Sequence, residues 1–171
     1  MKKLVFAAFL FIACAFTTHA QRFVLVDMEY ITQQIPAYQQ ANQKLETLSK
    51  QWQSEIDAKN NEAKELYETY QQTASSLSDT QKTAKENEIV AKEKEAADLR
   101  IKYFGPEGEM MKQQQELISP YLDAIYNAIK ELSIANGYDA VIDRASAQSM
   151  IFASPRIDIS DEVLEKLGYS N

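Results

Sequence analysis

The chain has 171 residues, of which 45% are hydrophobic and 25% are charged, and its formal net charge is −7 at pH 7. This acidic balance argues against nucleic acid or anionic lipid as a partner, because both carry negative charge. The only cysteine, Cys14, and the only histidine, His19, lie within the first twenty residues.

Residues 1–20 have the layout of a secretory signal: Lys2-Lys3, an apolar run from Leu4 to Phe16, and a short segment that ends at Ala20. The apolar run is shorter than the roughly 20 residues that span a bilayer. We therefore expect the chain to be exported, with cleavage after Ala20. The alternative is lipidation of Cys14, for which Phe11 in the preceding residues is a poor fit.

Cleavage after Ala20 would leave 16 basic and 25 acidic side chains and neither cysteine nor histidine. A Ser-His-Asp triad, a cysteine nucleophile and a zinc site with nitrogen or sulfur ligands are then excluded. No nucleotide or metal motif is present either. We therefore expect a protein that is not an enzyme and needs no cofactor.

After the signal, Phe23–Val26 predicts a strand, and residues 27–35 predict a short helix that ends at Pro36. A long helix should follow, because apolar residues recur at steps of mostly three, four or seven. This outgoing stripe comprises Tyr38, Ala41, Leu45, Leu48, Trp52, Ile56, Ala63, Leu66, Tyr70, Ala74 and Leu77.

The cluster at 75–79 favours a turn, and Ser78 followed by Gln81 matches a capping box that starts a second helix. The result is an antiparallel hairpin in which the numbers of facing residues add to about 155. On the returning helix, the expected apolar positions are Ala84, Val90, Ala91, Ala97, Ile101 and Phe104.

The returning helix is interrupted by Gly105, Pro106 and Gly108, opposite Trp52. These residues are candidates for a hinge, and the alternative is a plain separation of two helices. Glu107 and Glu109 could form an acid/base pair, but two solvated acids that open a helix are the favoured explanation, because no apolar pocket is apparent around them.

After Gly108 the sequence predicts a helix with a buried face, which ends at Asn136-Gly137. That face comprises Met111, Leu117, Ile118, Tyr121, Leu122, Ile125, Ile129 and Leu132. Strands are expected at 138–143 and 149–153, forming a sheet with residues 23–26. Ser160 should cap a last helix that ends at Gly168. Calcium binding by Asp158, Ser160, Asp161 and Glu162 is the alternative to capping.

The fold class is therefore α+β, mainly α, with a long antiparallel helical hairpin on a small β body. Residues 37–117 form the arm, and residues 21–36 and 118–171 form the body. A body this small should need further copies of itself to bury its apolar faces. The heptad pattern alone would also allow a dimer.

Aromatic residues are frequent on the arm, where a coiled-coil seam would prefer Leu and Ile. Tyr and Trp provide apolar area that tolerates water, which suits weak contacts with varied apolar segments. The candidates for such contacts are Trp52, Tyr67, Tyr70, Tyr103 and Phe104. The alternative is that these rings fill the seam between the two helices.

The order of these parts resembles the Skp/OmpH family of periplasmic chaperones. The resemblance covers the signal, the strand that runs into Asp27-Met-Glu-Tyr-Ile31, a glycine-free hairpin, Gly137–Asp143 and the closing segment Asp158–Leu167. The break at Phe104–Glu109 looks like the form that this family takes in Bacteroidetes.

The resemblance implies a homotrimer with a central β-barrel and three helical tentacles around a cavity. This cavity would hold unfolded outer-membrane β-barrel proteins without ATP. The expected oligomer core comprises Phe23, Leu25, Val141, Ile142, Ile151 and Phe152. Family members often have basic tentacle tips that touch lipopolysaccharide, whereas Lys82, Lys85, Lys92 and Lys94 are matched here by Glu86, Glu88, Glu93 and Glu95. Lipopolysaccharide is therefore not an expected partner. A structural coiled-coil scaffold of the cell envelope is the alternative function.

Overall fold

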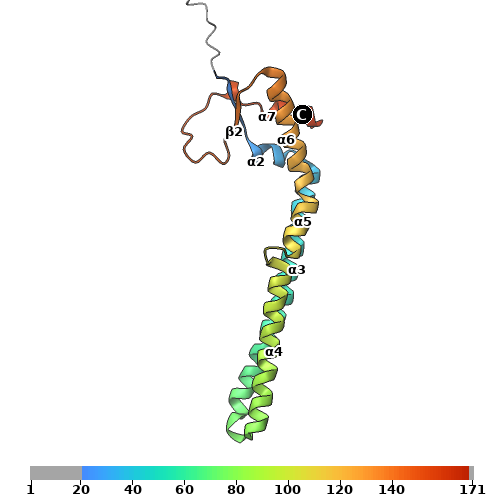
Figure 1. Ribbon diagram of the computed structural model, residues 1–171, viewed down its shortest axis with the longest axis vertical. Coiled ribbons are helices and arrows are strands. Elements are labelled where there is room, and N and C mark those ends of the chain that lie inside the picture. Colours follow the sequence, from blue (N-terminus) through green and yellow to red (C-terminus); the bar gives the residue numbers. More distant parts are fainter. Residues whose placement is uncertain (1–20, 170–171) are drawn as a thin grey trace, which may run out of the picture.

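The computed structural model describes residues 21–169. The expected signal segment, its cleavage site after Ala20 and the alternative lipidation site at Cys14 lie outside this range. A long arm of antiparallel helices stands on a small body that contains two strands (Figure 1). The predicted α+β, mainly α class and the helical hairpin are confirmed.

The outgoing helix, α3 (Pro36–Thr73), is continuous over 38 residues and is about 57 Å long at 1.5 Å per residue. Pro36 occupies its first turn, where the missing N–H costs no hydrogen bond. Every member of the predicted outgoing stripe is buried or half-buried, and Ile56 is completely buried. The predicted stripe is therefore confirmed.

The chain reverses through a 3₁₀ turn (Ala74–Ser76) into α4 (Asp79–Phe104). The predicted capping box is confirmed. Ser78 Oγ accepts a hydrogen bond from Gln81 N at 3.4 Å, and Ser78 N donates to Gln81 Oε1 at 2.9 Å. These two bonds satisfy backbone groups that have no partner inside the helix.

The predicted apolar face of α4 is wrong. All six residues assigned to it, from Ala84 to Phe104, are exposed. The side chains buried against α3 are instead Ile89, Ala96 and Tyr103, spaced by seven residues. The predicted pairing is correct, because Trp52 faces Tyr103 and their numbers add to 155.

After Phe104 the backbone makes a turn through residues 105–108 and re-enters a helix as α5 (Glu109–Leu117). A second interruption at Ile118 precedes α6 (Ser119–Asn136), whereas the sequence predicted one helix from 109 to 136. Pro120 explains this interruption, since proline fits the first turn of a new helix but not the interior of an old one. Gly137 ends α6 in the left-handed conformation, as predicted (φ 65°).

The body joins the two ends of the described chain. Strand β1 (Phe23–Val26) pairs in parallel with β2 (Ala140–Asp143), and Val24 lies opposite Val141. Helix α2 (Met28–Gln33), α6 and α7 (Ser160–Leu167) pack against one face of this sheet. The core comprises Val24, Val26, Ile31, Ile35, Ile125, Ala128, Ile159, Val163 and Leu164.

Two predictions for the tail are wrong. Residues 149–153 form no strand, and Ile151 and Phe152 are 100% and 83% exposed. The single chain offers this segment no ladder partner, and the second edge of β1 is used by a bridge between Leu25 and Asp158. Ser160 does not cap α7 with its side chain, because its hydroxyl is directed to Asp27 instead.

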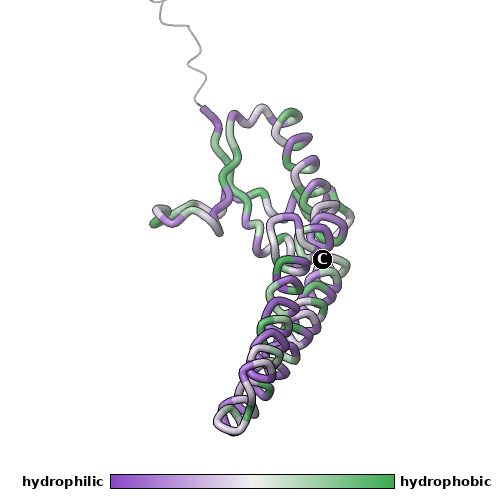
Figure 2. The backbone as a smooth tube through the Cα atoms, turned by 60° about the horizontal axis from the view of Figure 1, so that its bottom comes forward, coloured by the Kyte–Doolittle hydropathy of each residue, from purple (hydrophilic) through white to green (hydrophobic). Residues whose placement is uncertain are grey.

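Hydropathy is mixed along the arm, where hydrophobic and hydrophilic residues alternate around both helices (Figure 2). Within residues 21–169, no helix combines the length and the apolar character needed to cross a membrane.

Candidate functional site

Three aromatic residues of the arm lie together where α4 ends. Trp52 and Tyr103 stack with ring centroids 5.0 Å apart and planes within 6°, and Phe104 meets Trp52 edge-on at 6.2 Å. Leu48, Ile56, Leu99 and Met110 complete this second hydrophobic core. Tyr103 donates its hydroxyl hydrogen bond to Glu55, and this bond together with burial raises the pKa of the phenol above its ordinary value.

The five candidates for client contact thus fall into three groups. Trp52 and Tyr103 are 9% and 7% exposed and fill the seam, which was the alternative for these rings. Tyr67 is 49% exposed and Phe104 is 37% exposed, so both present apolar area to solvent. Tyr70 is half-buried and donates a hydrogen bond to Glu86 across the hairpin.

Between the aromatic core and the tip, the seam contains a layer of four charges. Lys59 lies 3.2 Å from Glu62 and 3.3 Å from Glu95. Lys92 lies 3.0 Å from Glu62 and 3.3 Å from Glu95. The hydrogen bond from Lys92 contributes most to the lowered pKa of Glu62, and that from Lys59 contributes most for Glu95. This ionic layer links α3 to α4 beside the small buried side chains of Ala63 and Ala96.

The break in the returning helix is tightly built. Gly105 N donates to Ile101 O at 2.9 Å, and Gly108 N donates to Gly105 O at 2.9 Å. A Cβ on Gly108 would lie 2.8 Å from Tyr103 O and 2.9 Å from Lys102 O, so only glycine fits without backbone movement. Helix α3 runs past this level without interruption.

Glu107 and Glu109 show no sign of an acid/base pair. Glu107 is exposed, and Glu109 accepts a hydrogen bond from Lys112 at 2.8 Å, which lowers the pKa of Glu109. General acid catalysis needs a carboxyl group with a raised pKa. Glu109 is the acidic residue in the first turn of α5 and Glu107 is a solvent-exposed acid in the preceding turn, which agrees with the favoured explanation.

The sheet of the body is apolar on both faces. Val24, Val26 and Val141 point into the core, while Phe23 and Ile142 on the opposite face are 48% and 41% exposed. Parallel strands are normally covered on both sides. Of the six residues expected in an oligomer core, Phe23, Ile142, Ile151 and Phe152 are exposed, Val141 is half-buried, and Leu25 is buried within the chain.

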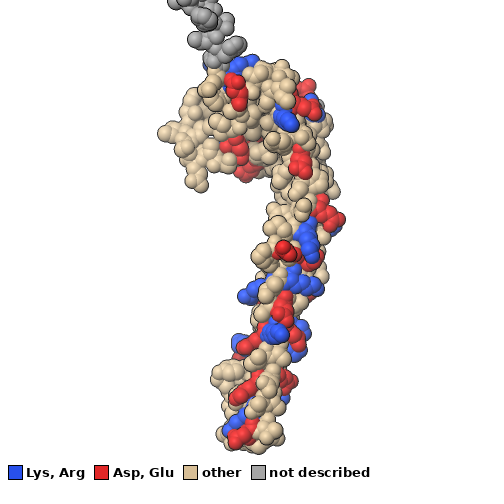
Figure 3. Space-filling view, viewed as in Figure 1, with Lys and Arg blue, Asp and Glu red and all other residues tan. Residues whose placement is uncertain are grey.

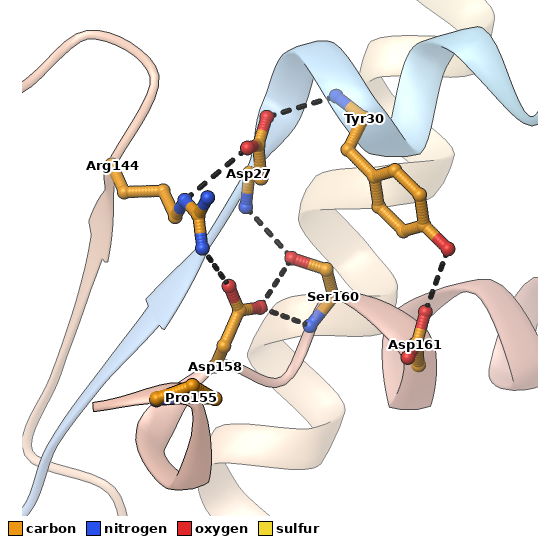
Figure 4. A pocket seen from close by; sticks show the side chains of 7 residues that line it. All are labelled: Asp27, Tyr30, Arg144, Pro155, Asp158, Ser160 and Asp161. Carbon is orange, nitrogen blue, oxygen red and sulfur yellow. Dashed lines mark hydrogen bonds and ion pairs between the residues drawn. The ribbon is translucent and has the colours of Figure 1, made fainter. Parts of the chain in front are cut away.

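A polar pocket of about 320 Å³ lies where the end of β1, the end of β2 and the start of α7 meet (Figure 4). Arg144 bridges two carboxylates, with Nε 3.2 Å from Asp27 Oδ2 and one terminal nitrogen 2.8 Å from Asp158 Oδ2. Ser160 accepts from Asp27 N at 2.8 Å and donates to Asp158 Oδ1 at 2.6 Å. We call these four residues the latch.

The charges of the latch are satisfied internally. Burial favours the neutral form of Asp158, but the hydrogen bonds from Ser160 and the ion pair with Arg144 outweigh it and lower its pKa. Asp161, a candidate calcium ligand, accepts instead from the hydroxyl of Tyr30 at 2.9 Å. Among residues 21–169, no cluster of acids, histidines or cysteines is arranged to hold a metal ion. The sequence signal for the latch was weak, because its members are far apart in the chain.

Known proteins match this chain over nearly its whole length. The family model "Outer membrane protein (OmpH-like)" matches residues 22–167. The Chaperone protein Skp of Yersinia enterocolitica is 27% identical over 98% of this chain and 99% of its own length. The Chaperone protein Skp of Photorhabdus laumondii is 29% identical with the same coverage.

A solved structure has the same fold. The crystal structure described as that of an OmpH-like outer membrane chaperone from Caulobacter crescentus matches with a TM-score of 0.61 and 14% identity. It covers 86% of this chain and 84% of its own chain. The family match spans the strand, both helices of the arm and the closing helix α7. The chain therefore belongs to the OmpH-like outer membrane protein family, which includes the Skp chaperones.

Proposed function

We propose that this protein is an ATP-independent holdase of the periplasm, which binds unfolded outer-membrane β-barrel proteins between its helical arms and prevents their aggregation. The observation that carries the proposal is the long arm with apolar and aromatic side chains in solvent, in a chain that matches Skp chaperones over nearly its whole length. Surfaces of this kind are rare on proteins that have no partner for them.

The proposed function includes assembly of the chain as a homotrimer. The side chains of Phe23, Ile142, Ile151 and Phe152 are apolar and are left exposed by a single chain. Strand β2 has a ladder partner on one side only within the described chain. A second copy could supply residues 149–153 as a further strand, and three copies would close the sheet into the small barrel expected from the resemblance.

Client binding by such arms would depend on many weak contacts. Each exposed apolar side chain contributes little, but three arms around one client raise the effective concentration of every contact. Release then needs no nucleotide, because individual contacts break easily. Basic and acidic side chains are interspersed along the face of the arm that Figure 3 shows, which supports leaving lipopolysaccharide out of the proposed partners. No cofactor and no nucleic acid are part of this proposal.

The test is light scattering after a urea-unfolded outer-membrane β-barrel protein is diluted into buffer with or without the chain from Gln21. We expect scattering to be suppressed at a near-stoichiometric amount of trimer, without ATP. Undiminished aggregation over a range of salt concentrations would refute the holdase and favour the envelope scaffold. That alternative predicts saturable binding to one folded partner instead.

A further inference from the structure

Helix α4 carries two parallel rows of apolar side chains. Ile89, Ala96 and Tyr103 form the row that packs against α3. Each is followed directly in sequence by a residue of a second row, so the second row lies about 100° around the helix from the seam. This outward row comprises Val90, Ala97, Ile101 and Phe104, all exposed, with Val90 at 59% and Ile101 at 67%.

The outward row leads into a cleft at the helix break. The cleft has a volume of about 510 Å³, within the range of roughly 300–1,000 Å³ that is usual for ligand pockets. Ile101, Gly105, Pro106 and Gly108 line it together with two basic and two acidic residues, Lys102, Lys112, Glu107 and Glu109. Because Gly105 has no side chain, the backbone turn leaves a space that a regular helix would fill.

We propose that the outward row and this cleft form one binding track for an extended apolar segment of an unfolded outer-membrane β-strand. One aromatic or large aliphatic side chain of that segment enters the cleft beside Ile101. This inference rests on the proposed holdase function and assigns its client contact to a defined face of α4.

The dimensions of the track fit an extended peptide segment better than a folded partner. From Val90 to Phe104 it is about 21 Å long and one side chain wide. A track of this length and width offers far less surface than the ~1,200 Å² that a stable protein interface buries. Its small size therefore argues against a folded partner or a second copy. An extended segment of about six residues spans the same length and places three side chains on one face.

The chemistry of the track agrees with its dimensions. Strands of outer-membrane barrels alternate apolar and polar residues and carry aromatic residues at their ends. The track offers an apolar row for the alternating face and a cleft for an aromatic ring. Lys94 and Asp98, on the same turns of α4 as Ala97, have opposite charges. The track therefore does not select a client by net charge.

The experiment uses a fluorescein-labelled ten-residue peptide that alternates Leu with Ser and Thr and carries one benzoylphenylalanine for photo-crosslinking. A control peptide has Ser at that position. Binding to the chain from Gln21 is measured by fluorescence anisotropy, and crosslinks are located by mass spectrometry. The variants are Ile101→Asp and Val90→Asp, with Ala58→Asp on the exposed surface of α3 as the charge-matched control.

We expect crosslinks within residues 101–112 and an affinity loss of about tenfold for Ile101→Asp, equivalent to about 1.4 kcal/mol, with the control within about twofold of wild type. Unchanged affinity of the Ile101 variant, or crosslinks elsewhere, would overturn the track while scattering suppression by the wild type preserves the holdase. If the wild type neither binds peptide nor suppresses scattering, both proposals fail. A changed sedimentation coefficient of the Ile101 variant would make the row an interface between copies and overturn the track.

Discussion

Trp52 of the uninterrupted helix α3 stacks on Tyr103, the second-last residue of α4, so an aromatic pair bridges the level at which the returning helix breaks. The break is therefore packed against a continuous rod. Bending at residues 105–108 would have to bend α3 or separate the two rings. A hinge at Gly105, Pro106 and Gly108 remains a proposal that the following variants can test.

Truncation of the aromatic pair should weaken the arm strongly. We expect Trp52→Ala to destabilise the protein by about 3–5 kcal/mol, the usual cost of removing a buried large aromatic side chain. Urea unfolding followed by circular dichroism at fixed protein concentration measures the effect. Tyr67→Ala, at a half-exposed position of the same helix, is the control. Equal losses of unfolding free energy in the two variants would show that the stacked pair stabilises the arm no more than a half-exposed tyrosine does.

A side chain at Gly108 should disturb the break. Gly108→Ala places a Cβ within 2.9 Å of three backbone atoms, and we expect a loss of about 1–3 kcal/mol, typical of overpacking. Hydrogen exchange of residues 101–112 should rise in this variant. The effect should stay local if α3 holds the arm straight. If exchange rises along the whole arm, the break acts as a hinge whose geometry the tip depends on.

The ionic layer should make the outer half of the arm sensitive to acid and salt. Glu62 and Glu95 have lowered pKa values because of Lys92 and Lys59, so the stability that these pairs contribute is present above the ordinary carboxyl pKa. It is lost as the pH falls through the lowered values. We expect the protection factors of the tip amides, corrected for the intrinsic exchange rate at each pH, to fall at pH 3 to 4 and at high salt.

The matched variants for the ionic layer are Glu62→Gln with Glu95→Gln, which should flatten the pH dependence of the protection factors of the tip amides. Glu68→Gln removes a carboxylate whose partner, Lys64, lies on the same helix, and it should leave the dependence intact. An equally steep acid response in both variants would exclude the cross-helix layer as its source.

The latch should stabilise the body through one buried hydroxyl. Ser160→Ala leaves Asp27 N without its acceptor and removes one of the two hydrogen bonds at Asp158 Oδ1, and we expect a loss of about 1–3 kcal/mol, mainly for the unsatisfied N–H of Asp27. Thermal unfolding measures this loss. Ser146→Ala, at an exposed position after β2, should change the stability little. A neutral Ser160 variant would indicate that water replaces the hydroxyl.

The uncovered face of the sheet should hold the copies together. We expect Ile142→Asp and Ile151→Asp to yield monomers, because each places a charge in the proposed oligomer core. Sedimentation velocity distinguishes monomer from trimer. Ile134→Asp, at a position on α6 that is 74% exposed, is the control and should remain trimeric. Intact trimers in both core variants would remove this placement of the interface.

Periodicity in the sequence predicts the arm well where only one apolar row exists. The stripe on α3, the capping box at Ser78 and the ends at Gly137 and Gly168 all follow from local residue patterns. On α4 two apolar rows lie side by side, and periodicity alone cannot tell which one faces α3. The prediction chose the row of Val90 and Ala97, whereas the longer reach of Ile89 and Tyr103 into the seam decides the packing.

The remaining failures concern contacts that a local pattern does not contain. Residues 149–153 have strand character, but a strand needs a ladder partner, and the single chain assigns the edge of β1 to Asp158. The hydroxyl of Ser160 finds Asp27, which is remote in sequence. Both outcomes depend on which distant segments meet in the body.

The parallel pairing of β1 with β2 also fixes an order of assembly. Phe23 and Ala140 are neighbours in the sheet but lie at opposite ends of the arm sequence. Closing so long a loop is slow for a flexible chain, whereas a hairpin forms from near-neighbour contacts and brings its two ends together. The arm should therefore become protected before the sheet, and pulse-labelled hydrogen exchange during refolding would show this sequence of events. A chain cut short before residue 140 would carry a formed arm but no body with which to join its copies.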